Sequence, residues 1–130
     1  MVRIVIQGDP RTKKNSEKIH INRKTKKPFV TPSDAYKLYE SNAAWQIWQQ
    51  WRNVTPIEDR VNVKCLFYMQ TRRVVDLPNL LNSVDDILVR FRVLRDDNSR
   101  IVAGHDGSRV LYDKDNPRVE IEITEMKENA

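Results

Sequence analysis

Five aspartates stand between residues 76 and 97 of a chain whose net charge is +5. Carboxylates, water and the phosphate oxygens of a substrate are the ligands with which proteins hold Mg²⁺. A bound Mg²⁺ polarises a phosphodiester and makes hydroxide available near neutral pH. The acidic cluster therefore predicts a site for Mg²⁺, with Mn²⁺ as a substitute, that acts on phosphate. The predicted metal ligands are Asp76, Asp86, Asp96 and Asp97, and the predicted catalytic residues are Asp76, Asp86 and Asp97.

A predicted helix over about residues 78–92 positions these acids. Its apolar side chains recur at a spacing that forms one stripe, namely Leu80, Leu81, Val84, Ile87, Leu88 and Phe91. The opposite side holds Asn79, Asn82, Ser83, Asp86 and Arg90, and Asp85 lies nearer the edge of the stripe. Pro78 suits a first turn, which leaves Asp76 just before the helix. In an alternative interpretation, Asp76 only caps the helix and Asp86 is a solvated surface charge.

Asp96 and Asp97 follow this helix, at the end where the helix dipole disfavours negative charge. Because the helix dipole does not stabilise carboxylates at this position, their presence there indicates a functional role. The helix is on the order of 20 Å long at 1.5 Å per residue, so Asp76 and Asp97 meet only if the chain folds back. A strand over residues 100–104, antiparallel to the helix, would permit that convergence.

The rest of the pattern predicts an α+β fold, with a mixed β-sheet and two main helices packed on it. Strands are predicted over residues 2–7, 61–69, 100–104, 108–112 and 119–124, the third and fourth as a pair around the turn at residues 104–107. A hairpin over residues 18–30 carries a basic tip, and Thr31 is the predicted N-cap of a long helix that ends near Asn53. With 130 residues the chain fits a single domain, residues 1–130, with a basic arm at about residues 9–31.

Positive charge is concentrated at the N-terminus, because residues 1–27 hold nine Lys or Arg side chains and two acidic ones. Such a segment is the usual mark of a protein that binds a phosphate backbone. The alternative is a basic segment that only keeps the protein soluble. The predicted DNA-binding residues are Lys13, Lys14, Lys24, Lys26, Lys27, Arg72, Arg73, Asn79 and Asn82.

Other side chains allow more than one interpretation. The long helix has a predicted buried stripe of Tyr36, Ala43, Ala44, Ile47, Trp48 and Trp51. Trp45 falls off this stripe, which suits a base-stacking platform or, more commonly, a core or subunit contact. His105 suits a metal ligand or a general acid, although the turn that contains it explains Asp106 and the neighbouring glycines. Cys65, the single cysteine, is predicted to be a small core residue without a disulfide.

The composition argues against a membrane protein. Hydrophobic residues make up 39% and charged residues 32% of the chain, which is typical of a soluble globular protein. No apolar run approaches the roughly 20 residues that span a membrane. The expected location is the cytoplasm.

The acidic motifs resemble those of the RusA family of Holliday-junction resolvases, in the form carried by phages and prophages. The family pattern reads D-x-D-N, a lysine three residues on, D-x-L and then D-D, and it is matched without a gap by Asp76-Leu-Pro-Asn79, Asp86-Ile-Leu88 and Asp96-Asp97. The likeness extends to Gly8-x-Pro10 with Lys13-Lys14-Asn15, to Thr31-Pro32 before a Tyr-rich helix, and to the strand 117–123. The resemblance therefore covers nearly the whole chain.

This resemblance implies a Mg²⁺-dependent, structure-selective endonuclease that resolves four-way DNA junctions by paired nicks. Asp76 and Asp97 would be the main metal ligands, supported by Asp86 and Asp96. A junction has two symmetric strands to cut, so the resemblance also implies a homodimer with one site per strand. The host would be a bacterial or phage-infected cell.

Two positions depart from the family pattern. Pro78 stands where a second aspartate is usual, and Asn82 where the catalytic lysine is usual. The first change removes a carboxylate from the metal site, and the second removes a cation that could stabilise the transition state. The candidates to replace that cation are Lys13, Lys14, Arg72 and Arg73. One alternative function is therefore a junction-binding protein of the same fold with weak or lost catalysis, and another is an interaction protein whose tryptophans face a partner.

Overall fold

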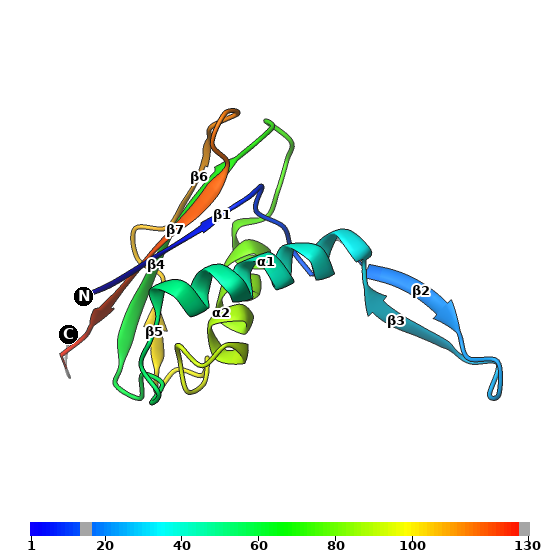
Figure 1. Cartoon of the computed structure of the whole chain (residues 1–130), viewed down its shortest axis with the longest axis horizontal. Coiled ribbons are helices and arrows are strands. Elements are labelled where there is room, and N and C mark those ends of the chain that lie inside the picture. The colour runs from blue at the N-terminus through cyan, green and yellow to red at the C-terminus, as the bar shows by residue number, and fades with distance from the viewer. Residues whose placement is uncertain (14–16, 128–130) are drawn as a thin grey trace.

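The computed structural model of the chain describes residues 1–13 and 17–127. Figure 1 shows the elements in the order β1 (Val2–Gln7), β2 (Glu17–Ile21), β3 (Pro28–Pro32), α1 (Asp34–Gln50), β4 (Val61–Met69), α2 (Leu77–Arg90), β5 (Val102–Gly104), β6 (Arg109–Tyr112) and β7 (Arg118–Glu125). The predicted α+β fold with a mixed sheet and two main helices is confirmed. No helix in this part of the chain has the length and apolar character needed to cross a membrane.

Five strands form the main sheet. Strand β7 pairs antiparallel with β1 on one side and with β4 on the other. The far edge of β4 pairs in parallel with β5 near its start and with β6 near its end. The two strands predicted around the turn at residues 104–107 therefore exist, but they follow one another along β4 and do not pair with each other. The turn between them lies against the middle of β4.

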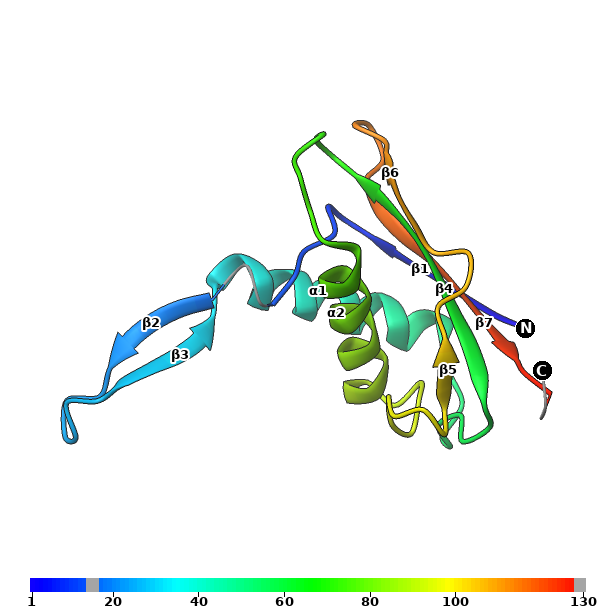
Figure 2. The same ribbon diagram turned by 180° about the vertical axis from the view of Figure 1, so that it is seen from behind.

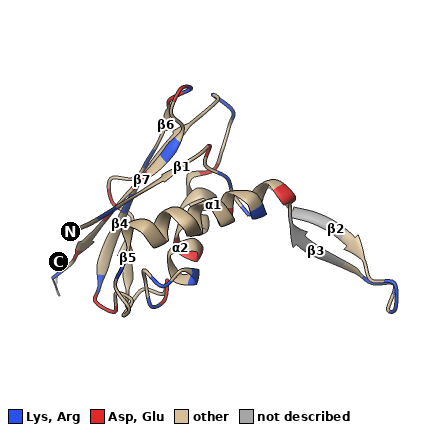
Figure 3. Ribbon diagram, viewed as in Figure 1, with Lys and Arg blue, Asp and Glu red and all other residues tan. Residues whose placement is uncertain are grey.

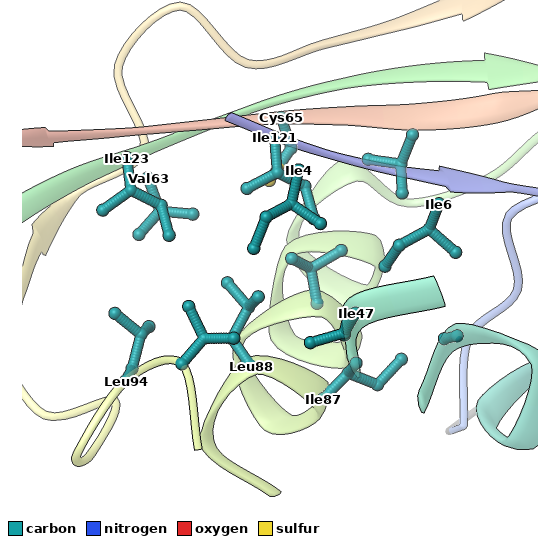
Figure 4. Packing of buried hydrophobic residues seen from close by; sticks show 14 of the residues in the cluster. Ile4, Ile6, Ile47, Val63, Cys65, Ile87, Leu88, Leu94, Ile121 and Ile123 are labelled. Carbon is teal, nitrogen blue, oxygen red and sulfur yellow. The ribbon is translucent and has the colours of Figure 1, made fainter. Parts of the chain in front are cut away.

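One face of this sheet carries the core. Residues alternate along β4 between buried and partly buried positions, as expected for a strand with one covered face. Both helices cover that face, so side chains such as Ile47 of α1 and Leu88 of α2 pack against Ile4 and Ile121 of the sheet (Figure 4). Cys65 is part of this core, as predicted, and burial raises the pKa of its thiol.

Helix α1 begins later than the sequence predicted, because strand β3 continues through Pro32. Ser33 is the N-cap, and its hydroxyl accepts a hydrogen bond from the backbone N–H of Tyr36 at 3.1 Å. The predicted N-cap at Thr31 is wrong. The helix ends at Gln50, before the predicted end near Asn53.

The rotation of α1 is set by two glutamines that face the free edge of β1. The Gln50 amide exchanges hydrogen bonds with the backbone of Val5 at 2.8 and 2.7 Å, and the Gln46 amide does the same with Gln7 at 2.6 and 3.1 Å. These bonds satisfy edge groups that would otherwise face solvent or another chain. They also turn Trp48 outward, so its predicted burial is wrong and its side chain is 59% exposed.

Helix α2 positions the acidic segment. It covers Leu77–Arg90, close to the predicted range, and Leu80, Val84, Ile87 and Leu88 are buried as predicted. Ser83 and Asp85 are also buried, although the sequence placed the first opposite the apolar stripe and the second near its edge. Figure 2 shows that the chain turns back through residues 91–101 and that β5 then runs antiparallel to α2. The predicted reversal of the chain is confirmed.

The hairpin of β2 and β3 projects away from the rest of the molecule (Figure 1). Its tip is held by Asn22, whose side-chain oxygen accepts the backbone N–H groups of Lys24 and Thr25 at 2.9 and 3.1 Å. Asn22 also exchanges backbone hydrogen bonds with Lys26 and Lys27 across the tip. The hairpin tip is therefore a hydrogen-bonded turn that exposes Lys24, Lys26 and Lys27.

Candidate functional site

Two predicted acids come together at the C-terminal end of α2. Partial burial and the nearby charge of Asp97 raise the pKa of Asp86, and Lys13 opposes this shift. Partial burial and a hydrogen bond with Asp96 raise the pKa of Asp97. Burial and the neighbouring carboxyl groups both disfavour the charged forms of Asp86 and Asp97. The arrangement favours a cation or a proton at this end of the helix.

Asp96 has a mainly structural part in this cluster. Its Oδ1 accepts the backbone N–H of Asp97 at 2.7 Å, and its Oδ2 accepts the side chain of Asn98 at 3.0 Å. The Asn98 side chain in turn accepts the backbone N–H of Arg100 at 3.0 Å. This chain of bonds shapes the turn that presents Asp97 beside α2.

Asp85 and His105 form a pair that the sequence did not predict. His105 Nε2 lies 2.8 Å from Asp85 Oδ2, and only 7% of the Asp85 side chain is exposed. This hydrogen bond is the largest influence on His105 and raises the pKa of its imidazole above the ordinary 6.5. The only signals in the sequence were a second aspartate next to Asp86 and its place at the edge of the apolar stripe. The partner could not be found, because His105 is 20 residues away.

The other predicted ligand, Asp76, lies at the opposite end of α2. It occupies the N-cap position without a hydrogen bond from its side chain to the helix backbone, and its Oδ2 accepts the Asn79 side chain at 3.3 Å. Ten residue steps along α2 separate Asp76 from Asp86, beside which Asp97 lies, a length of roughly 15 Å at 1.5 Å per residue. Among the described residues, no group of three acidic, histidine or cysteine side chains joins Asp76 to Asp97 in an arrangement that could hold a metal ion.

The loop before Asp76 is tied to the N-terminal part of the chain. Arg73 forms an ion pair with Asp9 at 2.9 Å and donates to the Pro10 carbonyl at 3.0 Å. The other oxygen of Asp9 accepts the backbone N–H of Gln70 at 2.9 Å. Arg73 is therefore engaged in holding this loop, and the neighbouring Arg72 stacks on the ring of Tyr112 at 4.2 Å.

Among the described residues, Lys13 is a predicted cation whose charge acts on one of the predicted acids. Its backbone N–H donates to the Ser83 hydroxyl at 3.2 Å, and its charge lowers the pKa of Asp86. Lys24, Lys26 and Lys27 are exposed at the distant hairpin tip, which appears blue in Figure 3. Asn82 is exposed on α2. Lys14 falls outside the described residues.

The side chains present can be compared with the ligands that a metal ion requires. Among residues 1–13 and 17–127, no three His, Cys, Asp or Glu side chains stand close enough to hold a metal ion as they are. The donors at the C-terminal end of α2 nevertheless fit a hard cation, because they are carboxylate oxygens. One of them, Asp85 Oδ1, is buried and has no hydrogen-bond partner in the described chain.

Comparison with known proteins agrees with this chemistry. A family profile described as endodeoxyribonuclease RusA matches residues 7–124, a span that contains all the acids discussed above. No curated protein matches the chain at a significant level. Because the family match covers most of the sequence, the chain belongs to the RusA family of endodeoxyribonucleases.

Proposed function

We propose that this protein is a Mg²⁺-dependent endonuclease that resolves four-way DNA junctions by paired nicks. The proposal rests on family membership, and the observation that carries it is the cluster of Asp86 and Asp97 beside Lys13. When bound, Mg²⁺, or Mn²⁺ in its place, would activate water and polarise the scissile phosphate. Asp97 and Asp86 would hold the ion, and Asp96 would keep Asp97 in position.

The basic residues serve to bind and orient the DNA. Lys13 stands beside Asp86 and offers a cation near the reacting phosphate, the place left without one by Asn82. The exposed lysines of the hairpin tip would bind a phosphate backbone away from the cut. A flexible or branched substrate has to reach both regions, which suits a junction better than a short duplex.

Asp76 belongs to the proposed metal ligands through the family pattern, yet roughly 15 Å of helix separates it from Asp86, beside which Asp97 lies. We propose that the working site combines Asp97 of one copy with Asp76 of a second copy. A homodimer has this property when its two-fold axis relates opposite ends of the two α2 helices. It would also present one site to each of the two symmetric strands of a junction.

An apolar groove on the surface is a candidate subunit contact. A cavity of about 730 Å³ lies between the C-terminal ends of α1 and α2 and is lined by Trp45, Trp48, Trp51, Phe91 and Val54, among others. Trp45 and Trp48 stack with their ring centres 5.4 Å apart and are 61% and 59% exposed. Their exposure contradicts a core position for Trp45 and leaves the subunit contact and the base-stacking platform.

Light scattering separates these two roles of the tryptophans. In a Trp45→Ala, Trp48→Ala double variant, a subunit contact predicts a monomer where the unaltered protein is a dimer. A stacking platform predicts an unchanged mass and weaker binding to junction DNA. A double variant with unchanged mass and unchanged DNA binding would exclude both roles.

A second candidate function is a junction-binding protein with weak or lost catalysis. Pro78, Asn82 and the absence of a ready-made metal site in the described residues favour it. One assay distinguishes the two candidates: a synthetic four-way junction and a linear duplex of the same sequence are incubated with the protein, with and without Mg²⁺. We expect symmetric nicks in the junction only, and only with Mg²⁺. Tight binding without cleavage in Mg²⁺ or Mn²⁺ would favour the second candidate.

A further inference from the structure

We infer that the hairpin of β2 and β3 enters the major groove of a duplex arm and contacts the edges of its base pairs. This inference deepens the proposed function and rests on DNA being the substrate. It gives the hairpin a part in choosing where on the DNA the protein binds, in addition to the phosphate contacts of its lysines. The segment concerned is residues 21–28, which comprises the hairpin tip and the last residue pair of the two strands, Ile21 and Pro28.

The first observation is the shape of the hairpin. Strands β2 and β3 form a two-stranded sheet of their own, which projects beyond the N-terminal end of α1 in both views (Figure 1 and Figure 2). Its five residue pairs make a ribbon roughly 17 Å long at about 3.4 Å per residue, with strands about 4.8 Å apart. The major groove is about 12 Å wide and about 8.5 Å deep, whereas the minor groove is only about 6 Å wide. The ribbon therefore fits the major groove together with its side chains and is long enough to reach the base pairs.

The second observation is the kind of side chain that this segment exposes. Residues 21–28 include four exposed cations and no acid, the cations being Arg23, Lys24, Lys26 and Lys27. Beside them the apolar side chain of Ile21 is 70% exposed and stands opposite the exposed Pro28. In the major groove, Arg and Lys donate to O6 and N7 of guanine, and apolar side chains contact the methyl group of thymine. Binding to phosphates alone needs only the cations, so the combination with an exposed apolar side chain favours a groove.

The third observation is the hydrogen bonding of the turn. The Asn22 side-chain oxygen accepts the backbone N–H groups of Lys24 and Thr25, and the Asn22 backbone is bonded to the backbones of Lys26 and Lys27. These bonds use backbone groups and the Asn22 side chain, so the turn does not depend on the cationic side chains. A turn held by its own bonds loses less freedom on binding than a flexible loop does. The Asn22 oxygen is engaged here, which leaves contact with the bases to Ile21 and the cations.

The test is methylation of guanine N7 by dimethyl sulfate in a synthetic four-way junction saturated with the full-length protein, without divalent metal so that no strand is cut. Guanine N7 lies in the major groove, so we expect the protein to protect guanines in the duplex arms. The protection should be lost in a variant with Arg23→Gln, Lys24→Gln and Lys27→Gln, which leaves Lys26 unchanged because its backbone is left-handed, with φ 56°. The matched control removes the same charge from exposed residues outside the hairpin and should keep the protection; it carries Arg60→Gln, Lys114→Gln and Lys127→Gln.

The contrary results are equally specific. Protection of the sugar-phosphate backbone from hydroxyl radicals without protection of N7 would overturn the inference, because the protein would then bind from outside the groove. Protection of N7 that the hairpin variant retains would overturn it as well. A hairpin variant with unchanged N7 protection and a smaller mass in light scattering would assign the hairpin to contact with a second copy of the chain.

A second variant, Ile21→Ala, tests entry into the groove without changing the charge. We expect junction binding to weaken a few-fold with an unchanged salt dependence, because the lost contact is apolar and releases no counterion. Unchanged affinity would show that Ile21 does not contact the bases and would count against the inference. Junction cleavage without hairpin-dependent protection of N7 would refute this inference alone. Protection of N7 that depends on the hairpin, without any cleavage in Mg²⁺ or Mn²⁺, would support it and refute the proposed nuclease.

Discussion

The two ends of helix α2 hold their acids in different surroundings. At the N-terminal end, Asp9 forms an ion pair with Arg73 at 2.9 Å, and Asp76 accepts a hydrogen bond from Asn79 at 3.3 Å. At the C-terminal end, Asp86 and Asp97 lie among other carboxyl groups, and the pKa of each is raised. An acid in an ion pair or hydrogen bond is accounted for by the contact that it makes. A cluster of acids that repel one another is instead an indication that a ligand binds there. This difference is the reason for proposing that the ion binds toward the C-terminal end of α2.

The largest effect should come from removing an acid at either end. We expect Asp97→Asn and Asp76→Asn each to lower junction cleavage at least about 100-fold, which corresponds to about 2.7 kcal/mol of barrier. Junction binding should stay the same or become slightly tighter, because each change reduces repulsion toward phosphates. Single-turnover cleavage and gel-shift assays check both statements. Near-normal cleavage by Asp76→Asn would confine the chemistry to the C-terminal end.

Mixing the two inactive variants shows whether the ends meet across the dimer. A mixed dimer of Asp76→Asn and Asp97→Asn has one site with both acids intact if each site draws on two copies. After subunit exchange we expect nicking to return to roughly a quarter of the normal rate, since about half of the dimers are mixed and each has one such site. Sites built within a single copy predict no recovery at all.

Binding at the hairpin tip can be tested apart from cleavage. Replacing Lys24, Lys26 and Lys27 with alanine should weaken binding to junction and duplex alike. It should also reduce the slope of log K against log salt by about 0.9 for each lysine that contacts a phosphate, or about 2.7 in total. Fluorescence anisotropy at several salt concentrations measures this slope. A slope that does not change would show that the hairpin tip does not contact DNA.

Adding an acid at the N-terminal end is a smaller perturbation. Pro78→Asp should raise Mn²⁺ or Mg²⁺ affinity by a few-fold, because the new carboxylate stands two residues after Asp76 and the helix dipole favours it there. Titration of cleavage with each metal gives the change. A folded, junction-binding variant that cleaves less at every metal concentration would mean that another carboxylate already fills this coordination position. Asp86 is the first candidate for that carboxylate.

The smallest effect concerns pH and the pair of Asp85 and His105 in the metal-free protein. The hydrogen bond that His105 donates to the Asp85 carboxylate raises the pKa of the imidazole above 6.5, its ordinary value. Protonated His105 therefore stabilises the folded state fully below this ordinary pKa, and the contribution is lost as pH rises through the higher folded-state pKa. Chemical denaturation between pH 5 and 9 should show this loss, and NMR titration should give the raised pKa. In Asp85→Asn both effects should disappear, and a pKa that stays high in this variant would assign the shift to another group.

Much of the fold was determined by local patterns that a single sequence carries. Alternation predicted β4 and β7, the apolar spacing predicted α2, and the basic tip between two short β segments predicted the hairpin of β2 and β3. The predicted start of α1 was wrong because both Thr31 and Ser33 can cap a helix. Only the continued pairing of β3 through Pro32 decides between them. The predicted burial of Trp48 was wrong because the rotation of α1 depends on the hydrogen bonds of Gln46 and Gln50 with the edge of β1.

For the site, the sequence by itself determined which acids and bases are present and which end of α2 each one occupies. Only the tertiary structure decided which of them are neighbours: it joined Asp85 to His105 and engaged Arg73 with Asp9. It also left Asp76 apart from Asp97 within one copy. The physical reason is that a helix fixes distances between its own residues at about 1.5 Å per step, whereas contacts between residues distant in sequence depend on how the sheet and loops pack. Spacing therefore predicted the separation of the two ends of α2, and folding alone supplied the partners at each end.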